Sequence, residues 1–235
     1  MTPHAVLTTA DALLLDFDGP VCALFANLPA RHVADRLRRL LAADLPAGIE
    51  GTGDPFDVFR HAATLGVEEA RTVQAALRAH ELEAAATATP TPGAHDLVRA
   101  WHATGRKLAV VSNNSRAAVD AYLRLHGLAG LVHAVSARTE PDPALLKPSP
   151  HLVSQAVEAL AVPPARCALV GDSATDLHAA RAAGTRAIGY ANKPGKAERF
   201  AAERPGAVVT SMTVLDRVVR AWGPGGARSA SAGAR

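Results

Sequence analysis

Short apolar runs and longer segments of helical pattern alternate through the second half of the chain. The longer segments are rich in Ala and Leu, contain few helix breakers and predict helices at 116–126, 150–160 and 175–183. Turn residues bound the apolar runs, which predict strands at 107–111, 131–136, 167–170, 185–189 and 207–210. Strands that alternate with helices indicate an α/β fold with a parallel sheet covered on both faces.

The first half of the chain has a different pattern. A single apolar strand is predicted at 12–16, and its partner strands must come from later in the sequence. Residues 23–87 are helical in pattern, with a Gly- and Pro-rich interruption at 46–55 and a break at Gly66. This block predicts a helical subdomain inserted after the first strand.

Two further segments limit the core. Residues 89–93 read Thr-Pro-Thr-Pro-Gly and predict a hinge, because they cannot continue a helix, and a new helix is predicted at 94–103. The last residues consist almost entirely of Gly, Ser, Ala and Arg and predict a disordered tail. We therefore expect a core from 1–20 and 91–222, a helical insertion at 21–90, and a tail at 223–235.

The composition is that of a globular chain with a sizeable core, because 49% of the residues are hydrophobic and 20% are charged. The longest hydrophobic run, 21–26, is far shorter than the roughly 20 residues that a membrane span needs. The first ten residues contain no Lys or Arg, which argues against a secretory signal. We expect a cytoplasmic protein without a membrane partner.

The net charge of +3 does not predict a nucleic-acid partner, because the basic residues are scattered and aromatic residues make up only 4% of the chain. Cys22 and Cys167 lie far apart and lack the spacing of a paired-thiol or zinc site, so reduced, partly buried thiols are expected. The sequence leaves the oligomeric state open.

Four segments place reactive side chains where a predicted strand ends or a predicted helix begins. In α/β sheets, ligands bind beyond the carboxyl ends of the strands, so these side chains are candidates for one site. Taken singly, each has an ordinary explanation as a turn, a helix cap or a surface lysine. The segments are Asp16-Phe-Asp18-Gly19, Ser112-Asn113-Asn114, Lys147-Pro-Ser-Pro, and Gly171-Asp172-Ser-Ala-Thr-Asp176.

In this order, the four segments resemble the four signature motifs of the haloacid dehalogenase superfamily of phosphohydrolases. The resemblance covers about residues 12–222 and is closest to phosphoglycolate-phosphatase-like members with a small helical cap. It implies a three-layered Rossmann-like α/β core with a parallel sheet and an inserted helical cap domain. The helical block at 23–87 fits that cap.

The resemblance also implies roles in a Mg²⁺-dependent phosphatase that acts on a small phosphorylated metabolite. Asp16 would be the nucleophile that forms an aspartyl-phosphate, and Asp18 would protonate the leaving alcohol and then activate water. Asp16, Asp172 and the backbone carbonyl of Asp18 would hold Mg²⁺. Ser112, the amide of Asn113, and Lys147 would bind the phosphoryl group, supported by Asp176.

Charge repulsion explains why the site would need a cation. Two carboxylates about 4 Å apart repel each other by roughly 4 kcal/mol at an effective dielectric constant near 20. With Asp18 protonated, Mg²⁺ and Lys147 would balance Asp16, Asp172 and Asp176, and a dianionic phosphate could then enter. We expect the metal ion to be what holds these carboxylates together.

Other members of the superfamily are only partly excluded. A dehalogenase usually lacks the second aspartate of the first motif, whereas Asp18 is present. A phosphonate-cleaving enzyme needs a lysine in its cap, and no lysine precedes Lys107. A sugar-phosphate mutase would keep the same catalytic groups and remains an alternative, as does a non-catalytic binding or regulatory protein that keeps the phosphatase scaffold.

Two features bear on substrate choice. Pro20 stands where many relatives carry Thr or Val, and it removes a backbone N–H near the phosphate. Between the predicted helices of the insertion lie polar residues that are candidates to contact a substrate, although ordinary loop chemistry also explains them. These candidates are Thr52, Asp54, Arg60 and His61.

Overall fold

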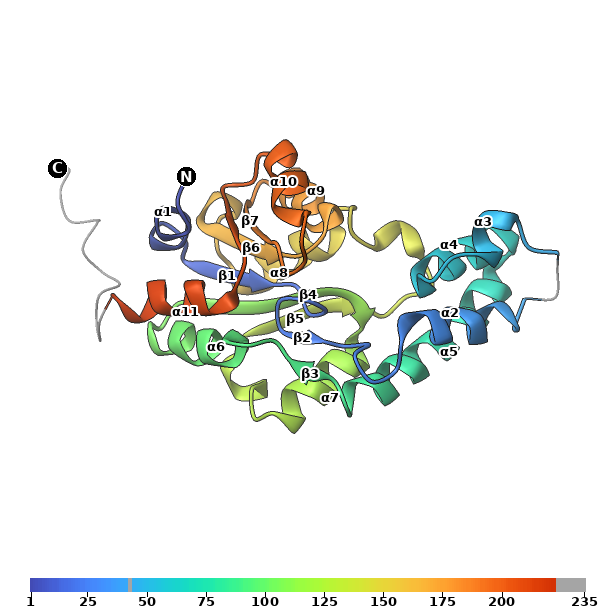
Figure 1. The fold of residues 1–235 in the computed structure, drawn as a ribbon. Coiled ribbons are helices and arrows are strands. Elements are labelled where there is room, and N and C mark those ends of the chain that lie inside the picture. Colours follow the sequence, from blue (N-terminus) through green and yellow to red (C-terminus); the bar gives the residue numbers. More distant parts are fainter. Residues whose placement is uncertain (42–43, 223–235) are drawn as a thin grey trace.

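The computed structural model describes residues 1–41 and 44–222, so the expected tail at 223–235 lies outside the described residues. Within them, six strands form one parallel sheet in the order β5-β4-β1-β6-β7-β8 (Figure 1). The strands are β1 (Ala12–Leu15), β4 (Lys107–Ser115), β5 (Ala134–Arg138), β6 (Cys167–Gly171), β7 (Arg186–Tyr190) and β8 (Ala207–Val209). The predicted α/β fold with a parallel sheet is confirmed.

Strand β1 lies in the middle of the sheet, where it pairs with β4 on one side and β6 on the other. Leu13 and Leu15 belong to the apolar cluster on one face, and Ala12 and Leu14 belong to the cluster on the other face. All four side chains are buried because helices cover both faces, which explains why this strand is apolar at every position.

The helices form two layers around the sheet. One face packs against α1 (Pro3–Thr8), α6 (Ala94–Ala103), α7 (Arg116–Leu125) and α11 (Met212–Arg220). The other face packs against α8 (His151–Leu160) and α9 (Ala174–Ala182), and α10 (Lys196–Glu203) lies beside α9. Three short 3-10 turns lie in the connections, η1 (Ala129–Leu131), η2 (Pro143–Leu145) and η3 (Pro164–Arg166).

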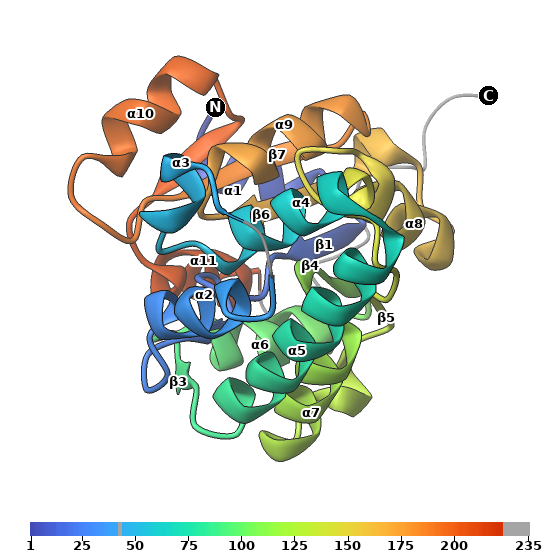
Figure 2. The same cartoon turned by 90° about the vertical axis from the view of Figure 1, so that its right-hand side faces the viewer.

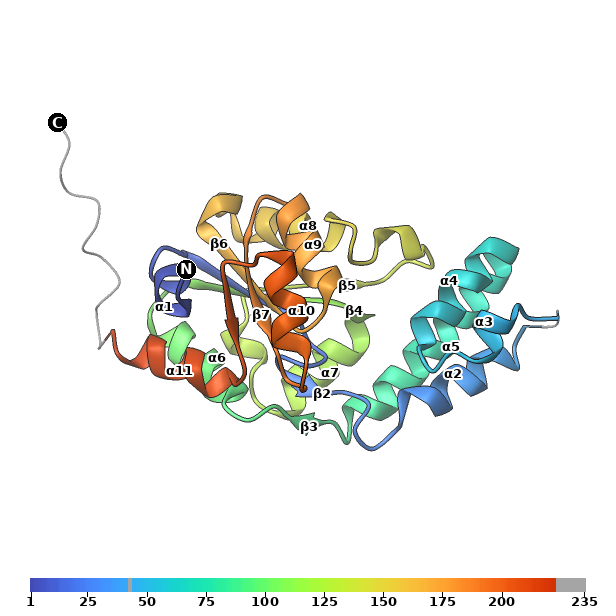
Figure 3. The ribbon, with the colours of Figure 1, turned by 45° about the horizontal axis from the view of Figure 1, so that its top comes forward.

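The inserted segment is helical, as predicted, but it begins differently. Its helices are α2 (Ala30–Arg38), α3 (Ala47–Glu50), α4 (Pro55–Leu65) and α5 (Val67–Ala85), and they lie beyond one end of the sheet, at the right of Figures 1 and 3. Figure 2 looks from that side, with the insertion in front of the sheet.

The prediction that the helical block starts at residue 23 is wrong. Cys22–Ala23 forms a short strand, β2, which pairs antiparallel with β3 (Thr89–Pro90), so the two ends of the insertion run side by side. Asn27 ties this ribbon further, because its side-chain amide donates to the carbonyl oxygen of Thr87 at 2.6 Å. The first helix of the insertion, α2, therefore begins only after Pro29.

Four helices of the described residues were not predicted: α1, α10, α11, and α3, which lies in the expected interruption at 46–55. The start signals of α1 are present in the sequence, since Thr2 caps the helix with its hydroxyl and Pro3 occupies the first turn.

Both cysteines are free and buried, as expected. Among the described residues, none of the helices is both long enough and apolar enough to span a membrane.

The central position of β1 yields a stability prediction. Leu13→Ala removes a fully buried side chain from the middle strand, so we expect the free energy of unfolding to fall by about 3 kcal/mol in urea titrations. Leu125→Ala, at a side chain that is 61% exposed, is the control and should leave stability nearly unchanged. Equal losses in both variants would contradict the central placement of this strand.

Candidate active site

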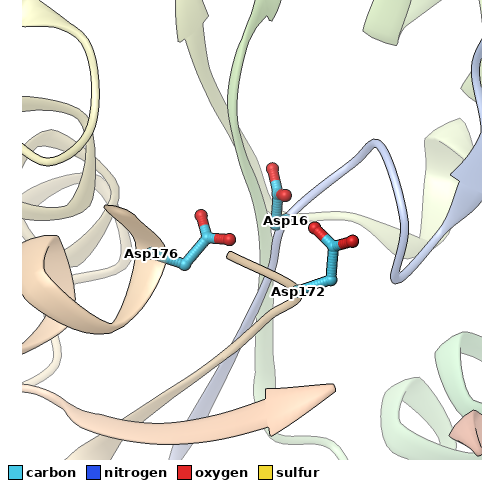
Figure 4. Close-up of side chains that lie close together, drawn as sticks. All are labelled: Asp16, Asp172 and Asp176. Carbon is cyan, nitrogen blue, oxygen red and sulfur yellow. The ribbon is translucent and has the colours of Figure 1, made fainter. Parts of the chain in front are cut away.

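The carboxyl ends of β1, β4 and β6, together with the connection from β5 to α8 that carries Lys147, bring the four predicted motifs to one edge of the sheet. Asp16 follows β1 directly, Ser112 lies in β4, and Asp172 follows β6. Figure 4 shows the side chains of Asp16, Asp172 and Asp176 lying close together. One carboxylate oxygen from each lies within 4.8 Å of the others. The segments are distant in sequence, and parallel pairing makes them neighbours.

Lys147 is buried between two of these carboxylates. Its Nζ lies 2.7 Å from Asp16 Oδ1 and 2.6 Å from Asp176 Oδ1, and it donates to the carbonyl oxygen of Val111 at 3.1 Å. The contacts with Asp16 and Val111 are hydrogen bonds, and the contact with Asp176 is an ion pair. Burial by itself lowers the pKa of Lys147, but the charges of Asp16 and Asp176 outweigh it and hold the pKa above its usual range.

Asp176 serves the helix and the site at once. It lies in the first turn of α9, where its Oδ2 accepts from the backbone N–H and the hydroxyl of Ser173 in a reciprocal capping box. Its other oxygen, Oδ1, faces Lys147. Gly171 makes room for this arrangement, since a Cβ there would collide with the Asp176 side chain. The helix-capping explanation is therefore confirmed, and the role of Asp176 in a site stays a prediction.

Two side chains that the sequence analysis missed hold Asp172. Lys196 Nζ lies 2.7 Å from Asp172 Oδ2 and 2.6 Å from its carbonyl oxygen, and Asn192 Nδ2 donates to the same Oδ2 at 3.0 Å. The available signal was their position, because residues 192–196 follow a strand that ends at the same edge of the sheet. Gly19 is needed beside them, with a φ of +111° and with Asp172 Cγ only 2.5 Å from where a Cβ would lie.

The two carboxylates of the first motif have different surroundings. Asp16 Oδ1 accepts from the backbone N–H of Phe17 at 2.8 Å and from Lys147. Burial and the charge of Asp176 raise the pKa of Asp16 well above its usual value, and Lys147 opposes the rise. A divalent cation would also oppose it, because a positive charge favours the ionised carboxylate.

Asp18 lies apart from the three clustered carboxylates. Its Oδ1 accepts from the backbone N–H of Leu24 at 2.9 Å. Burial raises the pKa of Asp18 to about 6, although the Leu24 hydrogen bond lowers it. A carboxyl group with this pKa is partly protonated near neutral pH and can exchange a proton in either direction.

The donor set fits a hard divalent cation such as Mg²⁺, which prefers carboxylate oxygens. However, the expectation that a metal ion alone holds the carboxylates together is wrong. Lys147 and Lys196 already contribute two positive charges against Asp16, Asp172 and Asp176. One net negative charge remains among these ionised groups, and a divalent ion would turn the balance positive, which favours an anionic ligand.

Ser112 and Asn113 lie at this edge, and the side chains of both make hydrogen bonds within the protein. The Ser112 hydroxyl donates to Asn114 Oδ1 at 3.0 Å, so its proton would have to change partner to reach a phosphoryl oxygen. The Asn113 side chain accepts from the backbone N–H of Lys147 at 2.8 Å and donates to the Lys147 carbonyl oxygen at 3.1 Å. Asn113 therefore anchors the loop that carries Lys147.

A cavity of about 350 Å³ opens beside Asp18 and Asp172. The β2–β3 ribbon and the loop after β7 form its walls, and Tyr190, Asn192 and Lys193 line it. This volume is that of a small-molecule pocket. Its lining carries two carboxylates, Asp18 and Asp172, and one ammonium group, Lys193, among neutral residues.

The four polar candidates in the insertion make local contacts. Thr52 donates to Asp57 at 2.7 Å, and Arg60 donates to the other oxygen of the same carboxylate at 2.7 Å. Asp54 caps α4 by accepting from the backbone N–H of Phe56, and His61 Nε2 is buried without a hydrogen-bond partner among the described residues. Their contact with a substrate stays a prediction.

The position of Lys147 predicts a large effect of its removal. Lys147→Met leaves two buried carboxylates without their shared cation, so we expect the free energy of unfolding to fall by about 3 kcal/mol or more without divalent ions. Urea titration checks this, with Lys107→Met at an exposed position as the control. An unchanged unfolding midpoint for Lys147→Met would show that this ammonium does not hold the carboxylates.

Comparison with known proteins agrees with this geometry. The protein named "Phosphoglycolate phosphatase, plasmid" of Cupriavidus necator is 32% identical over 197 residues, which cover 79% of this chain and 84% of that protein. The crystal structure of CbbY from Rhodobacter sphaeroides in complex with phosphate has a TM-score of 0.65 at 24% identity, covering 88% of this chain and 96% of that chain. This second likeness concerns the fold alone.

The extent of the matches varies between relatives. Protein CbbY of Rhodobacter capsulatus is 35% identical over 99 residues, and this chain spans 43% of its length. The chain spans between 19% and 55% of the length of several other curated relatives that it matches. A family model described as haloacid dehalogenase-like hydrolase matches residues 10–184, which include all four motifs. The chain therefore belongs to the haloacid dehalogenase-like hydrolase family.

Proposed function

We propose that this chain is a Mg²⁺-dependent phosphatase that hydrolyses phosphoric monoesters of small metabolites through an aspartyl-phosphate on Asp16. One observation carries the proposal. Asp16, Asp172, Asp176 and Lys147 meet at the carboxyl edge of the sheet, with Asp18 two residues beyond Asp16. Cavity, charge balance and family membership support it.

Asp16 is the proposed nucleophile. Its Oδ1 takes hydrogen bonds from Phe17 and Lys147, and Oδ2 receives none from the described part of the chain. A carboxylate oxygen without such a donor keeps its lone pairs for attack on phosphorus. In the first step Asp16 forms a bond to phosphorus, and the bond from phosphorus to the ester oxygen breaks.

Asp18 is the proposed acid and base. It donates its proton to the departing alkoxide, which leaves as an alcohol, and becomes a carboxylate. It then takes a proton from a water molecule that attacks the aspartyl-phosphate, which releases inorganic phosphate and regenerates Asp16. The pKa of about 6 supports both tasks, because neither protonation state of Asp18 is strongly disfavoured near neutral pH.

The remaining residues would bind Mg²⁺ and the phosphoryl group. Mg²⁺ held by Asp16, Asp172 and the backbone carbonyl of Asp18 would supply positive charge beside the phosphoryl oxygens. Lys147 offsets negative charge on Asp16 and on the transferring group, and Asp176 holds Lys147 in place. Ser112 and the backbone amide of Asn113 receive phosphoryl oxygens.

The helical insertion, proposed as a cap domain at 21–90, would cover a small substrate bound at the edge of the sheet. Phosphoglycolate, which the name of the Cupriavidus necator relative gives as substrate, is a first candidate, and Lys193 in the cavity lining offers a positive charge to its carboxylate. A core at 1–20 and 91–222 would then carry the catalytic groups. The cytoplasmic location stays a prediction of the sequence.

Replacement of the nucleophile tests the proposal. Asp16→Asn removes the attacking oxygen with little change in size, so hydrolysis of p-nitrophenyl phosphate with Mg²⁺ should fall by about 10,000-fold or more. Circular dichroism checks that the variant folds. Retained turnover would exclude Asp16 as the nucleophile, and isomer instead of inorganic phosphate from a hexose 1-phosphate would favour the mutase alternative.

Metal removal gives a second test. EDTA should abolish turnover, and added Mg²⁺ should restore it, because the carboxylate cluster lacks the cation that offsets phosphoryl charge. Calorimetry should show that Asp172→Asn weakens Mg²⁺ binding by at least about 10-fold. Full turnover in EDTA, or unchanged Mg²⁺ affinity in the variant, would contradict the metal assignment.

A further inference from the structure

A carboxylate from the insertion is buried against the segment that carries Ser112. Glu81, in the C-terminal half of α5, has a fully buried side chain. Its Oε2 accepts from the backbone N–H of Ser115 at 2.8 Å and from Arg138 Nη2 at 2.6 Å, and its Oε1 accepts from Asn114 Nδ2 at 3.2 Å. Three donors from the core therefore converge on one side chain of the insertion.

Glu81 determines how the Asn114 amide is oriented. An ionised carboxylate only accepts hydrogen bonds, so Asn114 must turn its NH₂ group toward Glu81. The carbonyl oxygen of that amide then faces Ser112 and accepts the hydroxyl proton at 3.0 Å. Glu81 thus fixes, through Asn114, the position of the Ser112 side chain, whose proton has to leave Asn114 when a phosphoryl oxygen binds.

A second branch passes through Arg138. The side chain of Arg138 is 1% exposed, and its Nε donates to the carbonyl oxygen of Asn113 at 3.0 Å. Its guanidinium also lies 5.5 Å from the ring centre of Phe59 in α4. Through the two branches, Glu81 holds residues 112–115, the last four residues of β4, where the pairing with β5 shifts register just before α7 begins. We call this segment the 112–115 turn.

Stability alone is a poor explanation for this buried pair. Replacing a buried ion pair by apolar side chains is often neutral or stabilising, since burying charge costs free energy. Helix α5 also contacts α7, so the ion pair is not the sole contact of α5 with the core. What the pair does supply is a defined position for polar groups of the turn.

We propose that Glu81 is a positioning residue that holds the 112–115 turn in the geometry that receives a phosphoryl group. The insertion then contributes to phosphate binding indirectly, because Glu81 holds the residues of the 112–115 turn. Any contact of the insertion with the rest of the substrate would be additional. This inference rests on the proposed function, because it needs a phosphoryl group at Ser112 and Asn113.

The test compares Glu81→Gln with Glu83→Gln. A glutamine at position 81 places an NH₂ group against Arg138 or Asn114, so one of these donors loses its acceptor. We expect the dissociation constant of inorganic phosphate, measured by calorimetry with Mg²⁺, to rise by about 10-fold, together with the KM for p-nitrophenyl phosphate. Glu83 lies on the same helix with a side chain 60% exposed, and its variant should match the wild type.

A second variant covers the case in which Glu81→Gln does not fold. Glu81→Gln with Arg138→Gln leaves no unpaired buried charge, and its phosphate affinity should still fall. A lower thermal midpoint with unchanged phosphate affinity in the folded variant would overturn the inference and leave Glu81 a structural residue only.

The two proposals fail differently. Normal phosphate binding by the wild type without any turnover would exclude the proposed phosphatase activity but not the role of Glu81. Turnover with unchanged phosphate affinity in the Glu81 variants would exclude only the role of Glu81. A wild-type chain that binds no phosphate would exclude both.

Discussion

The ammonium group of Lys147 lies between the carboxylates of Asp16 and Asp176, and the geometry of the site depends on that contact. Two such carboxylates repel each other by roughly 4 kcal/mol when they are about 4 Å apart at an effective dielectric constant near 20. The Lys147 charge offsets this repulsion, and hydrogen bonds to Asp16 and to the carbonyl oxygen of Val111 fix the direction of the ammonium group. Asn113 holds the backbone of the same residue.

Ordinary rules of local structure and the demands of the site coincide in this chain. Asp176 caps a helix with one oxygen and pairs with Lys147 through the other. Gly19 and Gly171 lie where a Cβ would collide with Asp172 and Asp176, respectively. Asp172 and Asp176 therefore each require a glycine beside them.

Two sets of ion pairs lie near the motif residues. Lys147 and Lys196 pair with the cluster directly, and the ion pair of Glu81 with Arg138 lies behind the turn that carries Ser112. The second pair connects helix α5 of the insertion to the core. The insertion therefore reaches the segment that carries Ser112 through a helix, and not only through its loops. We infer that this buried pair serves more to fix the positions of the polar groups around it than to stabilise the fold.

The sequence by itself determined the α/β class, most strands and helices, and the four motifs at the ends of strands or the starts of helices. These features follow from periodicity, turn residues and side-chain chemistry over a few neighbouring positions. Only the tertiary structure decided that Cys22–Ala23 pairs with Thr89–Pro90, that Lys196 and Asn192 hold Asp172, and that Glu81 meets Arg138. Such contacts join residues far apart in the chain, and no local pattern encodes them. They arise because strand pairing and helix packing bring separate surfaces together.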